Sequence, residues 1–146
     1  AQRIVARREN GLLTTTGELV EVIKAAIPAA TRRTGPHPAK RTFQAIRIEV
    51  NGELRDLETA VCNAIRTLKP GGKIGIISFH SLEDRIIKHT FRDLARDCIC
   101  PPELPVCQCG HQATLRNVSK AIRPTEQELE DNPRARSAIL RVAEKV

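Results

Sequence analysis

The chain of 146 residues contains no methionine, tryptophan or tyrosine, and its only aromatic rings outside histidine are Phe43, Phe79 and Phe91. This scarcity disfavours RNA-binding modules that stack bases on aromatic platforms. No run approaches the roughly 18 apolar residues that a membrane span needs, and no opening stretch resembles a signal peptide, so we expect no membrane association. Because translation begins at methionine, we expect the chain to be a piece of a longer protein.

The composition is that of a packed, basic globular protein. Apolar residues make up 40% and charged residues 28%, and the 24 Lys and Arg exceed the 17 Asp and Glu to give a net charge of +7. Five of these excess charges fall in residues 1–41, which hold eight Lys or Arg and three Glu. The rigid Gly35–Pro38 loop is flanked by Arg32, Arg33, Lys40 and Arg41. Such a loop suits phosphate contacts, and a solvated loop without a partner is the alternative.

The first half of the sequence predicts helices. A basic helix over residues 1–9 is stopped by Asn10-Gly11, and Thr15 with Glu18 forms a capping-box pattern before a helix that ends at Pro28. Residues 43–50 alternate in polarity before Asn51-Gly52, which favours a hairpin. Apolar residues at steps of three and four continue to residue 68, however, so we predict one long helix over 42–68.

The second half predicts strands among helices. Residues 73–79 are a short apolar run after a Pro-Gly-Gly turn, typical of a strand covered on both faces, and a helix follows to about residue 96. This order predicts part of a parallel α/β sheet. Residues 114–119 and 138–143 are further predicted strands, and Thr125 with Glu128 is a second capping pattern.

Polar residues gather at the carboxyl end of the 73–79 strand, where ligands bind in open α/β sheets. One interpretation is a nucleophile site with His80 as base, although the G-x-S-x-G elbow is absent. Another makes Ser81 a helix cap, Glu83 and Asp84 dipole partners and Arg85 a salt-bridge donor, and a third is a substrate-contacting loop. The candidate substrate-pocket residues are Ser78, His80, Ser81, Asp84 and Arg85.

Four of the five cysteines crowd into residues 98–111, a pattern that suggests the reducing cytoplasm more than a secreted disulfide framework. Cys98, Cys100, Cys107 and Cys109 form two C-x-C pairs. Four thiolates can close a tetrahedral zinc site, and reduced thiols or a disulfide are the alternatives. We expect Cys62 to be a core residue.

A basic turn precedes the last predicted strand. Arg134 and Arg136 lie within Asn132–Ser137 and could meet phosphate, or they could pair with Glu126, Glu128 and Glu130. Charge alone does not separate these interpretations.

Four segments, in this order, resemble the bacterial ribosomal RNA small subunit methyltransferase H family. The cysteine stretch from Cys98 to Cys107 also resembles a form found in that family. The segments are His37-Pro38-Ala39-Lys40-Arg41-Thr42-Phe43-Gln44-Ala45-Ile46-Arg47-Ile48 with Asn51, Leu68-Lys69-Pro70-Gly71-Gly72, Ser78-Phe79-His80-Ser81-Leu82-Glu83-Asp84-Arg85, and Asn132-Pro133-Arg134-Ala135-Arg136-Ser137.

The resemblance implies an S-adenosylmethionine-dependent enzyme that methylates N4 of a cytidine in the decoding region of 16S rRNA. It implies an α/β fold, a class I (Rossmann-like) methyltransferase sheet interrupted by a helical insertion domain. Residues 1–38 would be the end of that insertion, and residues 39–146 the C-terminal part of the catalytic domain. The expected partner is the small ribosomal subunit in the cytoplasm.

The glycine-rich cofactor loop of the family has no counterpart in this sequence. We therefore expect the S-adenosylmethionine site to lie in a preceding half, and the isolated chain to be inactive. We also expect the chain to pair with another chain or with that half, because an unpaired apolar strand edge favours association. A non-catalytic basic RNA-binding or ribosome-binding module, or a small zinc-stabilised interaction domain, is the alternative.

Overall fold

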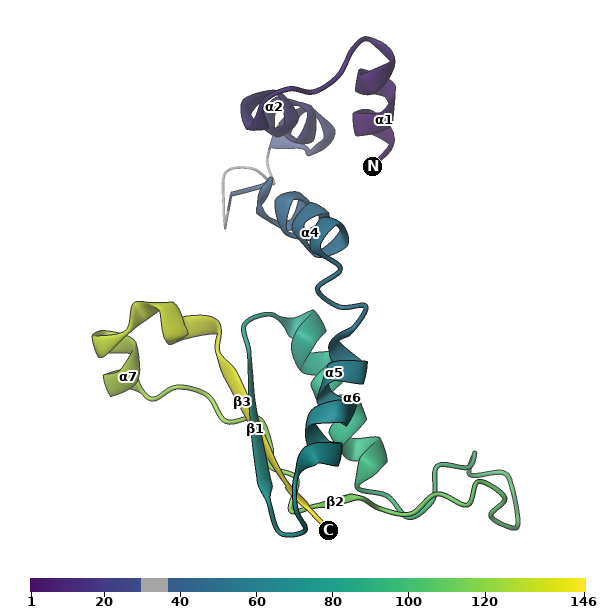
Figure 1. Ribbon diagram of the computed structural model, residues 1–146. Helices are drawn as coiled ribbons and strands as arrows, with labels where there is room; N and C mark the ends of the chain where they lie inside the picture. The colour runs from purple at the N-terminus through teal and green to yellow at the C-terminus, as the bar shows by residue number, and fades with distance from the viewer. Residues whose placement is uncertain (30–36) are drawn as a thin grey trace. The chain divides into compact units, whose positions relative to one another are not determined.

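The computed structural model describes residues 1–29 and 37–146, which form two compact units, Ala1–Glu53 and Leu54–Val146 (Figure 1). Arg32 and Arg33 lie outside the described residues. Within the described ranges, no helix combines the length and the apolar character needed to cross a bilayer. The division into an insertion domain over residues 1–38 and a catalytic part over 39–146 stays a prediction.

The described helices of the first unit are α1 (Gln2–Glu9), α2 (Thr16–Ala26) and α4 (Lys40–Asn51). The predicted capping box of α2 is confirmed. Thr15 Oγ1 accepts the Glu18 N–H at 3.2 Å, and Glu18 Oε2 accepts the Thr15 N–H at 3.1 Å. Two donors that would otherwise lack partners at the helix start are thereby satisfied.

The single helix predicted over residues 42–68 is wrong, because it is two helices, α4 and α5 (Leu57–Thr67). Gly52 caps α4 in the left-handed region, with φ of +64°, and its N–H donates to the Glu49 carbonyl at 3.3 Å. Glycine adopts this conformation without the strain that a side chain brings. The hairpin alternative is also wrong, because residues 43–50 are helical. Asn51-Gly52 is therefore a helix terminus.

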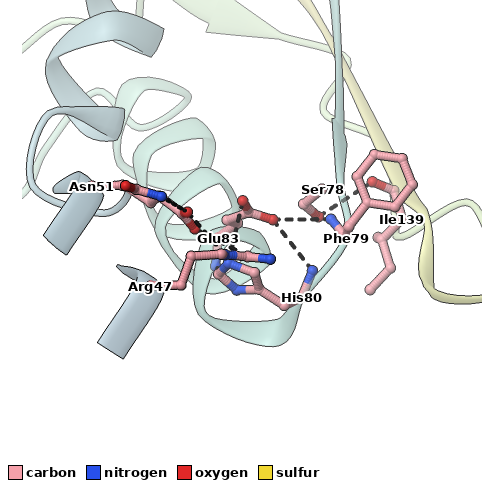
Figure 2. A network of polar contacts seen from close by, with 8 residues as sticks. Arg47, Asn51, Ser78, Phe79, His80, Glu83 and Ile139 are labelled. Carbon is pink, nitrogen blue, oxygen red and sulfur yellow. Dashed lines mark hydrogen bonds and ion pairs between the residues drawn. The ribbon is translucent and has the colours of Figure 1, made fainter. Parts of the chain in front are cut away.

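The turn after α4 is closed by the carboxylate of Glu53. Asn51 Nδ2 donates to Glu53 Oε1 at 2.9 Å, and Arg47 Nε lies 2.9 Å from the same oxygen (Figure 2). Both side chains come from the last turns of α4, so they fix the direction in which the chain leaves the helix.

The second unit contains a three-stranded sheet of β1 (Lys73–Ser78), β2 (Leu115–Arg116) and β3 (Ile139–Lys145). The strand order is β1-β3-β2, and both pairings are antiparallel, with Lys73 opposite Glu144 and Ser78 opposite Ile139. The strands predicted over 73–79 and 138–143 are confirmed, whereas the one predicted over 114–119 shrinks to two residues. The parallel sheet predicted from the sequence is therefore not found among the described residues, because β3 lies between β1 and β2 and is antiparallel to both. Since both are antiparallel to β3, β1 and β2 run parallel to each other.

Helices α5 and α6 (Ser81–Leu94) pack together, and α6 also contacts β1 and β3 (Figure 1). The helix expected to reach about residue 96 is thus confirmed. The buried core holds one side of each helix against the sheet and consists of Val61, Ile65, Ile87, Phe91, Leu115 and Ala143. Cys62, expected in the core, is half-buried.

The opposite face of β1 is open in the described chain, which corrects the expectation of a strand covered on both faces. Accessibility alternates along β1, and Ile77 is 58% exposed while Ser78 is 2% exposed. Alternation of this kind is the pattern of a half-buried strand.

The Pro-Gly-Gly turn places β1 beside β3. The Gly71 N–H donates to the Lys145 carbonyl at 2.9 Å, and the Lys145 N–H donates to the Gly72 carbonyl at 2.8 Å. Lys145 Nζ also donates to the Arg66 and Leu68 carbonyls, at 3.0 and 2.9 Å, at the end of α5. A cation satisfies helix carbonyls there and complements the helix dipole.

The segment before β3 contains α7 (Glu126–Asp131) and the 3₁₀ helix η1 (Pro133–Ser137). Thr125 Oγ1 accepts the Glu128 N–H at 3.2 Å, so the predicted cap of this helix is confirmed. The basic turn predicted from the sequence is η1.

Candidate functional site

The turn from β1 into α6 is capped by His80 and Glu83. His80 Nδ1 accepts the Glu83 N–H at 3.3 Å, while Glu83 Oε2 accepts the N–H groups of Phe79 and His80 at 3.0 and 3.3 Å (Figure 2). Ser81 is the first helical residue and is exposed, so the interpretation of Ser81 as the cap is wrong. The imidazole performs the role that a hydroxyl usually performs.

The two residues of the nucleophile interpretation, His80 and Ser78, already form hydrogen bonds with other groups. Because His80 Nδ1 accepts a hydrogen bond, the ring proton is assigned to Nε2, which is buried 3.2 Å from Glu83 Oε1 and forms no hydrogen bond with the described residues. Ser78 Oγ donates to the Ile139 carbonyl at 3.4 Å. Within residues 37–146 no hydrogen bond joins Ser78 to His80, so the geometry gives no support to a serine nucleophile with a histidine base.

Asp84 forms a bidentate ion pair with Arg141 of β3. The Arg141 Nε to Asp84 Oδ1 distance is 2.6 Å and the Nη2 to Oδ2 distance is 3.0 Å. The Asp84 side chain is 16% exposed and the Arg141 side chain is 10% exposed. Hydrogen bonds from Arg141 hold the pKa of Asp84 below its ordinary value, against the opposing effect of burial. Both carboxylate oxygens are occupied, so Asp84 fastens α6 to the sheet.

Arg141 was not among the residues singled out from the sequence, although a signal was present. It is the only arginine in the otherwise mostly apolar stretch 138–143, and it lies two residues before the core residue Ala143. The two-residue period of a strand places both on the helix-covered face. A buried arginine there requires an acidic partner.

The exposed side chains between residues 79 and 85 are those of Phe79, Ser81, Leu82 and Arg85. Arg85 lines a surface pocket of about 210 Å³ together with Glu58 and His89. Phe79, which was not a candidate from the sequence, is 56% exposed. The available signal was the alternation of a strand, which places the side chains of neighbouring residues on opposite faces. A cation, a hydroxyl, an aromatic ring and an aliphatic side chain are therefore the groups that can contact a substrate here.

The described basic candidates lie on two helices. Lys40 and Arg41 are the first two residues of α4 and are exposed. Cations are unfavourable at a helix N-terminus, so helix stability does not account for them. Arg134 and Arg136 are exposed in η1. Among the ion pairs of the described residues, none joins either arginine to a glutamate of α7.

The four clustered cysteines converge, as the C-x-C spacing allowed. All four sulfurs lie within 4.8 Å of one another, and Cys98 Sγ is 3.4 Å from Cys107 Sγ and 3.8 Å from Cys109 Sγ. None is in a disulfide. Hydrogen bonds from the backbone N–H groups of Ile99 and His111 lower the pKa of the Cys109 thiol to about 6.

Comparison with known proteins identifies the family. The family model described as the MraW methylase family matches residues 1–146. Proteins named ribosomal RNA small subunit methyltransferase H from Brevibacillus brevis, Halothermothrix orenii and a Paenibacillus species are 57%, 55% and 58% identical over the whole chain. The chain spans about half the length of these relatives, 47%, 47% and 46% respectively. The chain thus belongs to the MraW methylase family.

Proposed function

We propose that the intact protein containing this chain is an S-adenosylmethionine-dependent methyltransferase of small-subunit ribosomal RNA. Its target is N4 of a cytidine in the decoding region of 16S rRNA, and it acts in the cytoplasm. The observation that carries the proposal is the identity of 55–58% over the full chain to three proteins named small subunit methyltransferases. The exposed cationic sites on α4 and η1 agree with an RNA substrate.

The described residues do not by themselves fit the cofactor. The backbone donors at the start of α6, where a ligand could bind, are taken by the Glu83 carboxylate and the His80 ring. We propose that the cofactor site lies in the remaining half of the protein, and that the strands of that half complete a Rossmann-like sheet. The free edge of β1 supports this, because β1 is the outer strand of the described sheet and is paired there on its β3 side alone.

The candidates at the end of β1 divide into two groups with different proposed roles. Ser78, His80 and Asp84 are positioning residues, because their polar atoms hold the turn, α6 and β3 together. Ser81 and Arg85 are exposed and are the proposed substrate contacts. Transfer of a methyl group to an exocyclic amine needs alignment of the two reactants and removal of a proton from the amine. We assign Arg85 to the alignment.

In the intact protein, Arg85→Ala is expected to lower the single-turnover rate of small-subunit methylation about tenfold, equivalent to a barrier increase of about 1.4 kcal/mol. The matched control is Arg55→Ala, because Arg55 is also an exposed arginine and, within the described part of the chain, pairs only with the adjacent Asp56. The measurement follows a labelled methyl group into 16S rRNA. Unchanged rates in Arg85→Ala would remove Arg85 from the site.

The same assay tests the function itself. Wild-type protein should label the rRNA at one cytidine, and the 146-residue chain alone should neither bind S-adenosylmethionine in calorimetry nor label RNA. Intact protein that binds small subunits without transferring the methyl group would instead indicate a non-catalytic RNA-binding module. Stoichiometric cofactor binding by the isolated chain would contradict the placement of the cofactor site.

The phosphate-binding role of η1 predicts a change in salt dependence. Arg134→Ala/Arg136→Ala should reduce the slope of log affinity for rRNA against log salt by about 0.7–0.9 for each lost phosphate contact. The charge-matched control is Arg55→Ala/Arg92→Ala, since both of these arginines pair with a neighbouring aspartate. Equal slopes for the two double variants, in filter binding across a salt series, would count against the assignment.

A further inference from the structure

The loop between α6 and β2 brings four thiols together. In the sequence, this loop is separated from the turn at the end of β1 by the whole of α6. In Figure 1 this loop extends away from the sheet. From the convergence of its sulfurs we propose that Cys98, Cys100, Cys107 and Cys109 bind one structural zinc ion. The inference is independent of the proposed methyltransferase activity, because its readout is metal content.

The distances between the sulfurs match a tetrahedral tetrathiolate. With Zn–S bonds of about 2.3 Å, the edge of the sulfur tetrahedron is about 3.8 Å. The Cys98–Cys107, Cys107–Cys109 and Cys98–Cys109 sulfur pairs are 3.4, 3.5 and 3.8 Å apart, and Cys100 Sγ lies within 4.8 Å of the other three. An ion at the centre of these four sulfurs reaches all of them with small side-chain adjustments.

Disulfide formation explains this arrangement less well. A disulfide joins two sulfurs at about 2.05 Å and gives no reason for a second pair to approach the same point. Here each of Cys98, Cys107 and Cys109 has two cysteine sulfurs within 3.8 Å. Four soft sulfur ligands around one point are typical of zinc, and a Cys₄ set leaves no open coordination position. The site is therefore structural.

Backbone donors complete the sulfur environment. The Cys100 N–H donates to Cys98 Sγ and the Gln108 N–H donates to Cys100 Sγ, both at 3.4 Å. Hydrogen bonds of this kind stabilise negative charge on metal-bound thiolates and orient the ligands.

The loop has little else to order it. Its apolar side chains face solvent, with Ile99 50%, Leu104 44% and Val106 68% exposed, so it has no apolar core of its own. Apart from the contacts of the sulfurs and a hydrogen bond from the Leu104 N–H to the Pro101 carbonyl at 3.1 Å, the loop is held at its base. There the Thr114 N–H donates to the Leu94 carbonyl at 2.8 Å, and His111 Nε2 lies 3.0 Å from the Asp93 carbonyl oxygen. A bound metal ion that links several side chains orders small segments that have no apolar core.

The test is metal analysis of the intact protein, purified with reductant and without chelator. One zinc per chain is expected by plasma mass spectrometry. Titration of the thiols with a mercurial reagent should displace this zinc and release one equivalent per chain to a chromogenic chelator. Cobalt substitution should give the absorption of a tetrahedral tetrathiolate, which identifies sulfur as the ligand without reference to enzyme activity.

The matched variants are Cys107→Ser/Cys109→Ser and Cys62→Ser. The first should reduce zinc to background, and the second should keep one zinc, because Cys62 lies on α5 outside the cluster. Wild-type protein without zinc, with either four freely reactive thiols or a mass lowered by two hydrogens per disulfide, would overturn the proposal. Equal zinc loss in both variants would overturn it as well, since the cluster would then not be the binding site.

Discussion

Replacing Asp84 with asparagine is expected to lower the free energy of unfolding of the Leu54–Val146 unit by about 3–5 kcal/mol. The substitution removes the charge that compensates Arg141, whose side chain is 10% exposed, and leaves a buried cation without a counter-ion. The ion pair also connects α6 to β3, two elements that are 57 residues apart at this contact. Urea denaturation followed by circular dichroism measures the loss.

The control for Asp84→Asn is Asp93→Asn on the same helix. Asp93 also pairs with an arginine, Arg92, but those side chains are 47% and 45% exposed, so a change within about 0.5 kcal/mol is expected. Asp84→Leu/Arg141→Met should recover most of the stability, because replacement of both charges by apolar groups of similar volume is often neutral. If Asp84→Asn destabilises no more than Asp93→Asn, the ion pair does not stabilise the fold.

Acidification should reproduce part of the same loss. The pKa of Asp84 is lowered in the folded protein, first by its hydrogen bonds with Arg141 and then by the charge of that side chain. The stabilisation is therefore complete above the unfolded value, near 3.8, and is lost as the pH falls through the lower folded pKa. The stability difference between wild type and Asp84→Asn should narrow below about pH 4. A constant difference down to pH 2 would contradict the lowered pKa.

The features that could be predicted from the sequence are those set by neighbouring residues. The capping box at Thr15 and the Pro-Gly-Gly turn involve contacts within a few residues, so local chemistry determines them. A zinc site that draws the four cysteines together was one of the alternatives that the two C-x-C pairs left open, and the structure brings the sulfurs to one point. Local signals of this kind survive in any tertiary context.

The features that could not be predicted depend on residues distant in sequence or on a local motif that fits two structures. Asn51-Gly52 is compatible with a hairpin and with a helix end, because glycine readily adopts the positive φ that both require. The position of β3 between β1 and β2 could not be predicted, because the sequence does not show which strands pair with each other. The role of Asp84 follows from Arg141, so a carboxylate that looked available for substrate is part of the scaffold.

Replacing Phe91 with alanine should destabilise the second unit by about 3–5 kcal/mol, as much as the loss of the buried ion pair. Phe91 is fully buried, and it belongs to the core cluster in which Ile87 of α6, Leu115 of β2 and Ala143 of β3 meet. Truncation to alanine removes most of the ring and leaves a cavity that the surrounding helices and strands can close only in part.

The chain provides its own control, because Phe79 carries the same side chain in an exposed position. Phe79→Ala should change the free energy of unfolding by less than about 0.5 kcal/mol, since its ring is 56% exposed. Phe91→Leu should fall between the two, because it retains more of the buried volume. Thermal and urea unfolding should show the largest loss of stability for Phe91→Ala, an intermediate loss for Phe91→Leu and the smallest loss for Phe79→Ala. A Phe91→Ala loss as small as that of Phe79→Ala would mean that the contacts between α6 and the sheet do not form the core of this unit.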